Sequence, residues 1–240
     1  MKKFFTLALL TMCGLAVNAQ NIQLHYDFGH NIYSGEQGGR QPMTITLEHF
    51  SLDSEGSWFY FVDLDLNKKL FKGAYAEIAR EYFIENTLFA AHLEYNGGMN
   101  RSTCFQHAVL FGPAWNGHSS DFTKTYSVQL MYKHFFAGEA GTHSYSSAQL
   151  TGVWNLNFFN KAFTFSGFID FWRGEDADRK GQLVILAEPQ LWFNFAPFID
   201  GEKFSIGTEL EFSNNFIYNE DPKSSKTFFF NPTLAFKWTF

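Results

Sequence analysis

Paired carboxylates two residues apart are the first feature of this sequence that could carry chemistry. Asp63 and Asp65 form one pair, and Glu209 and Glu211 form another. Two neighbouring carboxylates can act as a general acid and base, or they can bind a cation. The same spacing also arises when a β-strand turns alternate side chains to one face. The meaning of these pairs therefore depends on the elements that hold them.

The segment Thr227–Phe240 shows what kind of element is expected. Its apolar residues are Phe228, Phe230, Leu234, Phe236, Trp238 and Phe240, and its polar residues of the other parity are Asn231, Thr233, Lys237 and Thr239. This alternation predicts a strand with one apolar and one polar face. A soluble sandwich gains nothing from such an aromatic edge, whereas a closing strand of a membrane barrel shows that face to lipid. The segment also resembles the C-terminal signal read by the machinery that assembles bacterial outer-membrane barrels, which is therefore an expected partner.

The first residues have the pattern of a secretory signal peptide. Lys2 and Lys3 precede an apolar run that ends at Val17, and small residues follow up to Ala19. Residues 1–19 are therefore expected to be removed, and the run is too short for a transmembrane helix. We interpret residues 20–240 as one barrel domain. Cys104 is then the one cysteine of the mature sequence, which excludes an internal disulfide.

Composition narrows the class of protein further. Aromatic residues make up 20% of the sequence, including 31 Phe, yet the mean hydropathy is −0.19. A barrel with an apolar outer band and a polar interior has this combination. Loss of Lys2 and Lys3 changes the formal net charge from −6 to about −8, which disfavours binding to nucleic acid. No apolar stretch of about 18 residues follows the signal segment, so a helical membrane protein is excluded.

Twelve alternating segments predict an all-β fold, a transmembrane antiparallel β-barrel of about 12 strands, although ten or fourteen strands also fit. The segments are Ile22–Phe28, Met43–Leu52, Ser57–Asn67, Ala74–Phe83, Leu88–Asn96, Cys104–Trp115, Thr123–Phe136, Ala148–Phe158, Phe163–Arg173, Leu183–Phe195, Phe204–Ser213 and Thr227–Phe240. Most of them supply the roughly 9–11 residues that a tilted strand needs to cross a bilayer. Pro189 and Pro232 lie inside segments and predict a local bulge or a strand end.

The gaps between these segments alternate in length. Gaps after even segments, such as Asp53–Gly56 and Phe159–Ala162, are short, whereas gaps after odd segments, such as Gly29–Gln41, are long. This alternation predicts that the N- and C-termini both lie on the periplasmic side of the outer membrane of a Gram-negative bacterium. The gap Ala196–Lys203 follows an even segment, yet it is longer than this alternation predicts.

The polar parity of the segments defines the side chains expected to face the lumen. They are His25, Asp27, Thr44, Thr46, Glu48, Phe50, Phe59, Phe61, Asp63, Asp65, Tyr75, Glu77, Glu81, Phe83, His92, Glu94, Gln129, Lys133, Gln149, Asn155, Asn157, Ser166, Phe168, Asp170, Trp172, Glu188, Gln190, Trp192, Asn194, Glu209, Glu211 and Lys237. Eleven of them are carboxylates and two are lysines. So many carboxylates must line water or a polar network.

Two interpretations of this lumen stay open. In one, the carboxylates bond to one another and to basic neighbours, so that the interior is blocked. In the other, the lumen is a solute pathway, because rings can stack on aromatic side chains while carboxylates accept hydroxyl and amino donors. A narrow negative pore also favours neutral or cationic solutes over anions. The candidate solute-binding residues are Asp27, Glu48, Phe59, Phe61, Asp63, Asp65, Tyr75, Glu77, Glu81, Asp170, Trp172, Glu188, Trp192, Glu209 and Glu211.

Two neighbouring segments carry a family resemblance. Trp58–Asp65, reading WFYFVDLD, and Tyr75–Glu81, reading YAEIARE, resemble the nucleoside-specific outer-membrane channel (Tsx-like) family. The resemblance implies a monomeric twelve-stranded barrel that passes nucleosides, with Asp63, Asp65, Glu77 and Arg80 as pore residues. Ala79 and Tyr82 stand where the family has proline and serine, which puts the identity of the solute in doubt. Arg80 has the parity of the lipid-facing side chains. It must therefore lie near a strand end or follow a bulge, unless the register assigned to this segment is wrong.

Enzymatic barrels are the competing class. An outer-membrane phospholipase would need His and Ser two residues apart on the lipid face, with an Asn on a neighbouring strand. His49–Ser51 and His118–Ser120 have this spacing, but no suitable Asn follows. Walker-type loops, nucleotide-binding glycine fingerprints and zinc-ligand spacings are absent from the sequence. We therefore expect a non-enzymatic protein without metal or cofactor.

The sequence as a whole favours a monomeric outer-membrane protein in contact with lipid. Its expected function is a passive channel for small polar solutes, with nucleosides as the leading candidates. The alternative is a barrel with a blocked lumen that has a structural role or binds a partner through its long loops.

Overall fold

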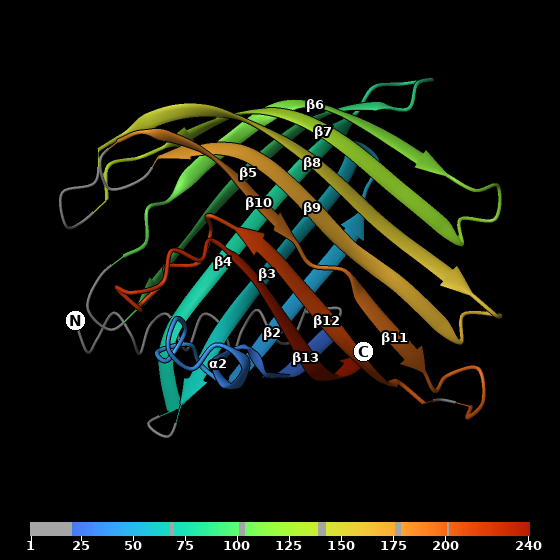
Figure 1. The fold of residues 1–240 in the computed structure, drawn as a ribbon. Coiled ribbons are helices and arrows are strands. Elements are labelled where there is room, and N and C mark those ends of the chain that lie inside the picture. The colour runs from blue at the N-terminus through green and yellow to red at the C-terminus, as the bar shows by residue number, and fades with distance from the viewer. Residues whose placement is uncertain (1–20, 68–69, 101–103, 139–142, 176–178, 201) are drawn as a thin grey trace, which may run out of the picture.

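A computed structural model describes residues 21–67, 70–100, 104–138, 143–175, 179–200 and 202–240 (Figure 1). The expected signal peptide lies outside the described residues. The strands are β1 (Asn21–Asp27), β2 (Met43–Leu52), β3 (Gly56–Asn67), β4 (Leu70–Phe83), β5 (Phe89–Asn100), β6 (Ala108–His118), β7 (Lys124–Phe135), β8 (Tyr145–Phe158), β9 (Phe163–Glu175), β10 (Gly181–Ala187), β11 (Gln190–Asn194), β12 (Phe204–Asn214) and β13 (Phe228–Thr239). A four-residue helix, α2 (Gly29–Ile32), follows β1.

All of these strands form one antiparallel sheet that closes on itself. Consecutive strands pair with one another, except that β10 and β11 each lie between β9 and β12, and β1 pairs with β13 from Asn21↔Thr239 to Asp27↔Thr233. Closure pairs the strands on both sides within the sheet, which is what a bilayer demands of a β-structure. Among the described residues, no helix is both long and apolar enough to span a membrane.

The thirteen assigned strands make a barrel of twelve, because β10 and β11 are two parts of one strand. Ala187 pairs with Ile169 and Gln190 pairs with Ser166, so the register against β9 is the same on both sides of the interruption. The break falls at Pro189, whose nitrogen carries no hydrogen to donate to the ladder. The predicted strand end at Pro189 is therefore confirmed. The alternative, a bulge with an inserted residue, is not found, because the register is unchanged. The twelve-stranded prediction is confirmed as well.

Most of the connections alternate in length around the barrel, as the sequence predicted. Short turns at residues 53–55, 84–88, 119–123 and 159–162 lie at one end, and longer segments such as 28–42 and 215–227 lie at the other. We call these the short-turn end and the long-loop end. The segment 195–203 at the short-turn end is long, and β3 and β4 are joined by residues 68–69 alone at the long-loop end.

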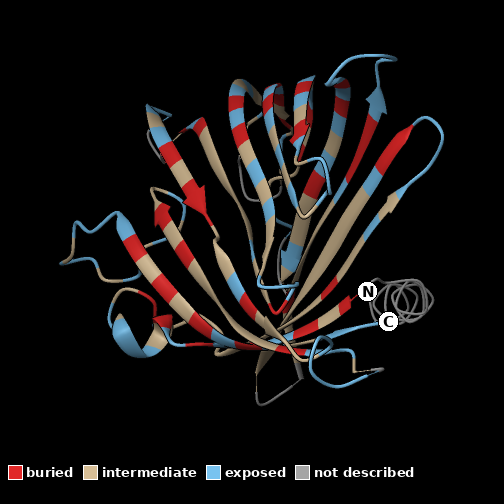
Figure 2. Ribbon diagram, turned by 90° about the vertical axis from the view of Figure 1, so that its right-hand side faces the viewer, coloured by how far each residue is buried: buried red, intermediate tan, exposed pale blue. Residues whose placement is uncertain are grey.

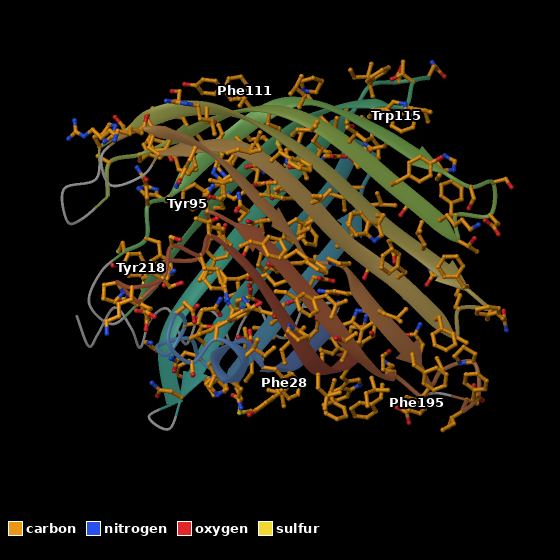
Figure 3. The ribbon with its side chains drawn as sticks, viewed as in Figure 1. Phe28, Tyr95, Phe111, Trp115, Phe195 and Tyr218 are labelled. Atoms are coloured by element: carbon orange, nitrogen blue, oxygen red, sulfur yellow. The ribbon has the colours of Figure 1, made fainter. Side chains whose placement is uncertain are left out.

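The two faces of the sheet differ in character. Figure 2 shows buried and exposed residues alternating along the strands. Outward side chains are apolar and exposed, as at Leu93, Phe111 and Phe236, and Figure 3 shows Phe111 and Trp115 pointing away from the barrel. This exposed band is the lipid-facing surface expected of a membrane barrel.

One wall of the interior is apolar rather than polar. Ala108, Leu110, Met131, Phe135, Trp172, Val184 and Leu186, which face inward from β6, β7, β9 and β10, form the hydrophobic cluster of the barrel. The sequence pattern did not assign Leu110, Met131 or Leu186 to the lumen. This cluster shares the inner face of its strands with polar side chains such as Gln129 and Lys133.

Candidate functional site

The register of the strands places every predicted lumen carboxylate on the inner face. Asn21 Nδ2 on β1 donates to Glu48 Oε1 at 2.9 Å. On β2, the Thr44 hydroxyl donates to Asp65 Oδ1 on β3 at 3.1 Å, and the Thr46 hydroxyl donates to Asp63 Oδ1 on β3 at 2.5 Å. The inward set thus includes Asp27, Glu48, Phe59, Phe61, Asp63, Asp65, Tyr75, Glu77, Glu81, Asp170, Trp172, Glu188, Trp192, Glu209 and Glu211.

Part of this inner surface is open to water. Phe59, Phe61, Asp63, Asp65, Tyr75, Glu77, Phe168, Asp170, Glu188, Gln190 and Glu209 are only half-buried. Because these side chains point into the barrel, a water-sized space must reach them there. Glu188 also interacts electrostatically with Glu209, Asp63 and Glu77. Carboxylates from different walls therefore face one another across a narrow lumen.

Aromatic rings line the same space on the β3–β4 wall. The ring centroids of Phe59 and Phe61 lie 6.0 Å apart, as do those of Phe61 and Tyr75. The Tyr75 hydroxyl donates to Glu77 Oε1 at 2.7 Å. This wall therefore presents flat apolar faces beside hydrogen-bond acceptors, as the sequence predicted.

Two lysines of the lumen lie against aromatic rings of the wall. Lys133 is 6% exposed, donates to Gln149 Oε1 at 2.7 Å, and lies 4.4 Å from the ring centroid of Trp172. Lys237 lies 4.0 Å from the ring centroid of Trp192, which is fully buried. Lys133 is buried, whereas Lys237 is half-buried, like the carboxylates of the open surface. Carboxylates and aromatic rings nevertheless outnumber the half-buried basic groups on the open surface of the lumen.

A hydrogen-bonded network occupies the inner face of β4–β7 toward the short-turn end. His92 lies between two carboxylates, with Nδ1 3.1 Å from Glu81 Oε1 and Nε2 3.3 Å from Glu94 Oε2. Asn116 Nδ2 donates to Glu81 Oε2 at 2.8 Å, and Gln129 Nε2 donates to Oε1 at 3.3 Å. Glu81 is therefore a member of a satisfied network rather than a free acceptor on the open surface.

Arg40 is a lumen residue that the sequence analysis missed. It belongs to the loop 28–42, and its guanidinium contacts Asp27 Oδ2 and Glu211 Oε2, each at 2.7 Å. Burial disfavours the charge of Arg40, but Glu211 and Asp27 outweigh burial, so the pKa of the guanidinium is raised. Loop residues have no periodicity, and nothing in the sequence indicated that this loop folds inward.

Arg80 requires a correction, because it faces outward and cannot line the lumen. It pairs with Trp58 across β3–β4, near the short-turn end. Its guanidinium makes two hydrogen bonds to Asp53, at 2.8 and 2.9 Å, and lies over the rings of Trp58 and Tyr82. The hydrogen bonds from Arg80 lower the pKa of Asp53 to about 2. A position near a strand end is one of the three explanations that the lipid-side parity of Arg80 left open, whereas the pore position that the resemblance implied is wrong.

The histidine–serine pairs show no catalytic arrangement within the described residues. His49 stacks on Tyr60 with centroids 5.0 Å apart, and its buried Nδ1 has no hydrogen-bond partner in the structure. His118 stacks on Phe122, while its Nδ1 lies 2.9 Å from the carbonyl oxygen of Ser119. Neither histidine is hydrogen-bonded to the serine two residues ahead. In the part of the chain that the structure describes, no group of three or more His, Cys, Asp and Glu is placed to hold a metal ion.

Comparison with solved structures supports the barrel fold. A NanC porin aligns with a TM-score of 0.58 at 10% identity, covering 92% of this chain and 98% of that chain. A KdgM porin aligns with a TM-score of 0.49 at 11% identity over 92% and 98% of the two chains. LpxR from Salmonella typhimurium aligns with a TM-score of 0.46 at 8% identity over 92% and 100%. At these identities the similarity to the NanC porin shows the fold alone.

Comparison with protein families covers the barrel as a whole. No curated protein matches the sequence. Residues 19–240 match a family model described as a domain of unknown function, DUF5020. That description does not name nucleoside channels, so the resemblance to the Tsx-like family stays a prediction. The chain belongs to the DUF5020 family.

Proposed function

We propose that this protein is a passive outer-membrane channel for small polar solutes. The observation that carries the proposal is the half-buried inner surface on which Asp63, Glu77, Glu188 and Glu209 stand beside aromatic rings. Carboxylates so placed inside a membrane barrel call for water or a solute as their partner. The similarity of the barrel fold to that of the NanC porin agrees with the proposal.

Nucleosides are the leading candidates for that solute. Their bases would stack on the Phe59–Phe61–Tyr75 wall, and their hydroxyl and amino groups would donate to Asp63, Asp65 or Glu77. The negative lumen disfavours anions, so nucleotides would be excluded. The strands β3 and β4 that carry these groups are those that resemble the Tsx-like family. The chain would act as a monomer, with its apolar band in lipid and its ends in the periplasm.

Liposome swelling tests this proposal. Vesicles containing the refolded protein are transferred into isotonic adenosine, a neutral disaccharide or an anionic nucleotide. We expect fast swelling with adenosine and slow swelling with the other two solutes. Equal entry of all three would replace the selective channel by a general pore. No swelling from a folded barrel would overturn the transport function and favour a blocked barrel that binds a partner through its loops.

A further inference from the structure

The first loop, residues 28–42, covers part of the inner wall at the long-loop end. The ring of Tyr33 lies 5.2 Å from that of Phe229, an inward side chain of β13 that is fully buried. The Tyr33 hydroxyl accepts a hydrogen bond of 3.3 Å from the backbone N–H of Phe230. This part of β13 extends beyond Asp27, where β1 ends. The loop therefore takes the place of a neighbouring strand at this end of the barrel.

The tip of this loop, Gly39–Arg40, reaches across the mouth of the barrel. Arg40 bridges Asp27 on β1 and Glu211 on β12, while the carbonyl oxygen of Gly39 accepts a hydrogen bond of 2.6 Å from Lys72 Nζ on β4. Four strands, β13, β1, β2 and β3, lie between β12 and β4 in the sheet. Two adjacent residues that contact both β12 and β4 must lie within the mouth rather than outside the wall.

The loop 215–227 holds the first loop in this position. Glu220 accepts a hydrogen bond of 2.9 Å from the N–H of Gly39, and its own N–H donates to the carbonyl oxygen of Glu36 at 2.8 Å. Lys226 Nζ lies 3.5 Å from Glu36 Oε1 and 4.5 Å from the ring centroid of Tyr33. These contacts are more exposed than the ion pairs of Arg40, whose partners Asp27 and Glu211 are both buried.

We propose that Arg40 is a specificity-determining residue of the channel, which fixes the loop tip in the mouth and thereby limits the size of the solutes that enter. This inference rests on the proposed channel function. Without Arg40, Asp27 and Glu211 would be buried carboxylates without their cation, an arrangement that costs far more than an exposed pair. They would attract water and cations, and the tip would lose its strongest anchor. The single positive charge of Arg40 also offsets one of the two negative charges of Asp27 and Glu211 at the entrance, so it moderates the cation preference of the pore.

Electrical recording tests this role with a matched pair of variants. Arg40→Gln removes the half-buried guanidinium that pairs with Asp27 and Glu211, and Arg173→Gln removes an exposed guanidinium on the outer face of β9. We expect Arg40→Gln to raise the single-channel conductance roughly twofold and to shift the reversal potential toward stronger cation selectivity. Arg173→Gln should match the wild type. Arg40→Gln channels that match Arg173→Gln channels in both quantities would overturn the inference.

Limited proteolysis gives a second readout that needs no channel activity. The double variant Asp27→Asn/Glu211→Gln keeps Arg40 but removes the charges that hold it. We expect trypsin to leave the bond after Arg40 intact in the folded wild-type barrel and to cleave it at least tenfold faster in the double variant. Equal cleavage rates in the two proteins would show that Arg40 does not anchor the loop. If the wild type conducts no current and the cleavage rates still differ between it and the double variant, the channel function is contradicted. The role of Arg40 in anchoring the loop would then still stand.

Discussion

Glu77 on β4 and Glu188, between β10 and β11, interact electrostatically across the lumen, although five strands separate them in either direction around the barrel. An electrostatic interaction between carboxylates on opposite walls indicates a narrow interior. Asp63 and Glu209 add to the same field from β3 and β12. Such a constriction requires cations, water or a solute with donor groups between its walls, which is why we assign transport to it.

Glu188→Gln removes one charge from this constriction while keeping the shape of the side chain. We expect the permeability ratio of potassium to chloride to fall roughly twofold, because the field that repels anions is weaker. The reversal potential in a potassium chloride gradient measures this ratio. Glu85→Gln makes the same charge change in the exposed turn 84–88 and should leave the ratio unchanged. An equal shift in the two variants would mean that Glu188 does not face the ion path.

Phe61→Ala removes the central ring of the β3–β4 aromatic wall. Stacking of a base on an aromatic side chain contributes about 1–3 kcal/mol, so the concentration of adenosine that half-blocks the ion current should rise about tenfold. Current block in a planar bilayer measures this concentration. Phe111→Ala deletes a ring of the same size from the outer face and serves as the control. If Phe61→Ala leaves the half-blocking concentration unchanged, the wall does not bind the base.

Gly167→Ala tests the place where Pro189 interrupts its strand. Gly167 has a φ of +144°, and a Cβ added there would collide with the carbonyl oxygen of Glu188. The positive φ and the collision both disfavour a residue with a side chain at this position. We therefore expect Gly167→Ala to lower the free energy of unfolding by about 1–3 kcal/mol. Gly152→Ala on β8 is the control, because its Cβ would lie 3.4 Å from Cγ2 of Ile169. Denaturant unfolding in detergent compares the two, and a similar loss in both would contradict the local cause.

The ion pair of Asp53 and Arg80 at the short-turn end predicts a dependence of stability on pH. Because Arg80 lowers the pKa of Asp53 from 3.8 to about 2, the ionised carboxylate stabilises the fold above pH 4. This contribution should be lost as the pH falls from about 4 to below 2. Unfolding of wild type and Asp53→Asn should therefore differ at pH 6 and converge below pH 2. In an Arg80→Gln background the pH-dependent difference should shrink; if it persists in full, Arg80 is not its cause.

Much of the fold follows from the period of the sequence alone. Outward rings fix the parity of strands such as β13, and a period of two then assigns residues like Asp63 and Glu77 to the other face. Arg80 illustrates this rule, because its parity gave the lipid side whereas the family resemblance placed it in the pore. The parity was uninformative where both faces of a strand are apolar, as around Leu110 on β6, so the hydrophobic cluster inside the barrel was not predicted.

Other features depend on tertiary contacts that no local pattern encodes. Arg40 lies in a loop, where side chains have no repeating direction, and its carboxylate partners are distant in the sequence. The opposition of Gly167 and Pro189 depends on the register between two strands, which only the paired sheet defines. Whether lumen carboxylates are accessible or bonded also depends on neighbours from several strands, as Glu81 and Glu188 illustrate.

Single-channel recording of the wild-type protein in a planar bilayer tests the central claim most directly. A potassium chloride gradient across the bilayer reports in one experiment whether the lumen conducts and which ion it prefers. We predict discrete current steps with a reversal potential on the cation-selective side, because carboxylates outnumber basic groups among the half-buried side chains of the lumen. A folded barrel that produces no steps, or steps with a preference for chloride, would contradict the account.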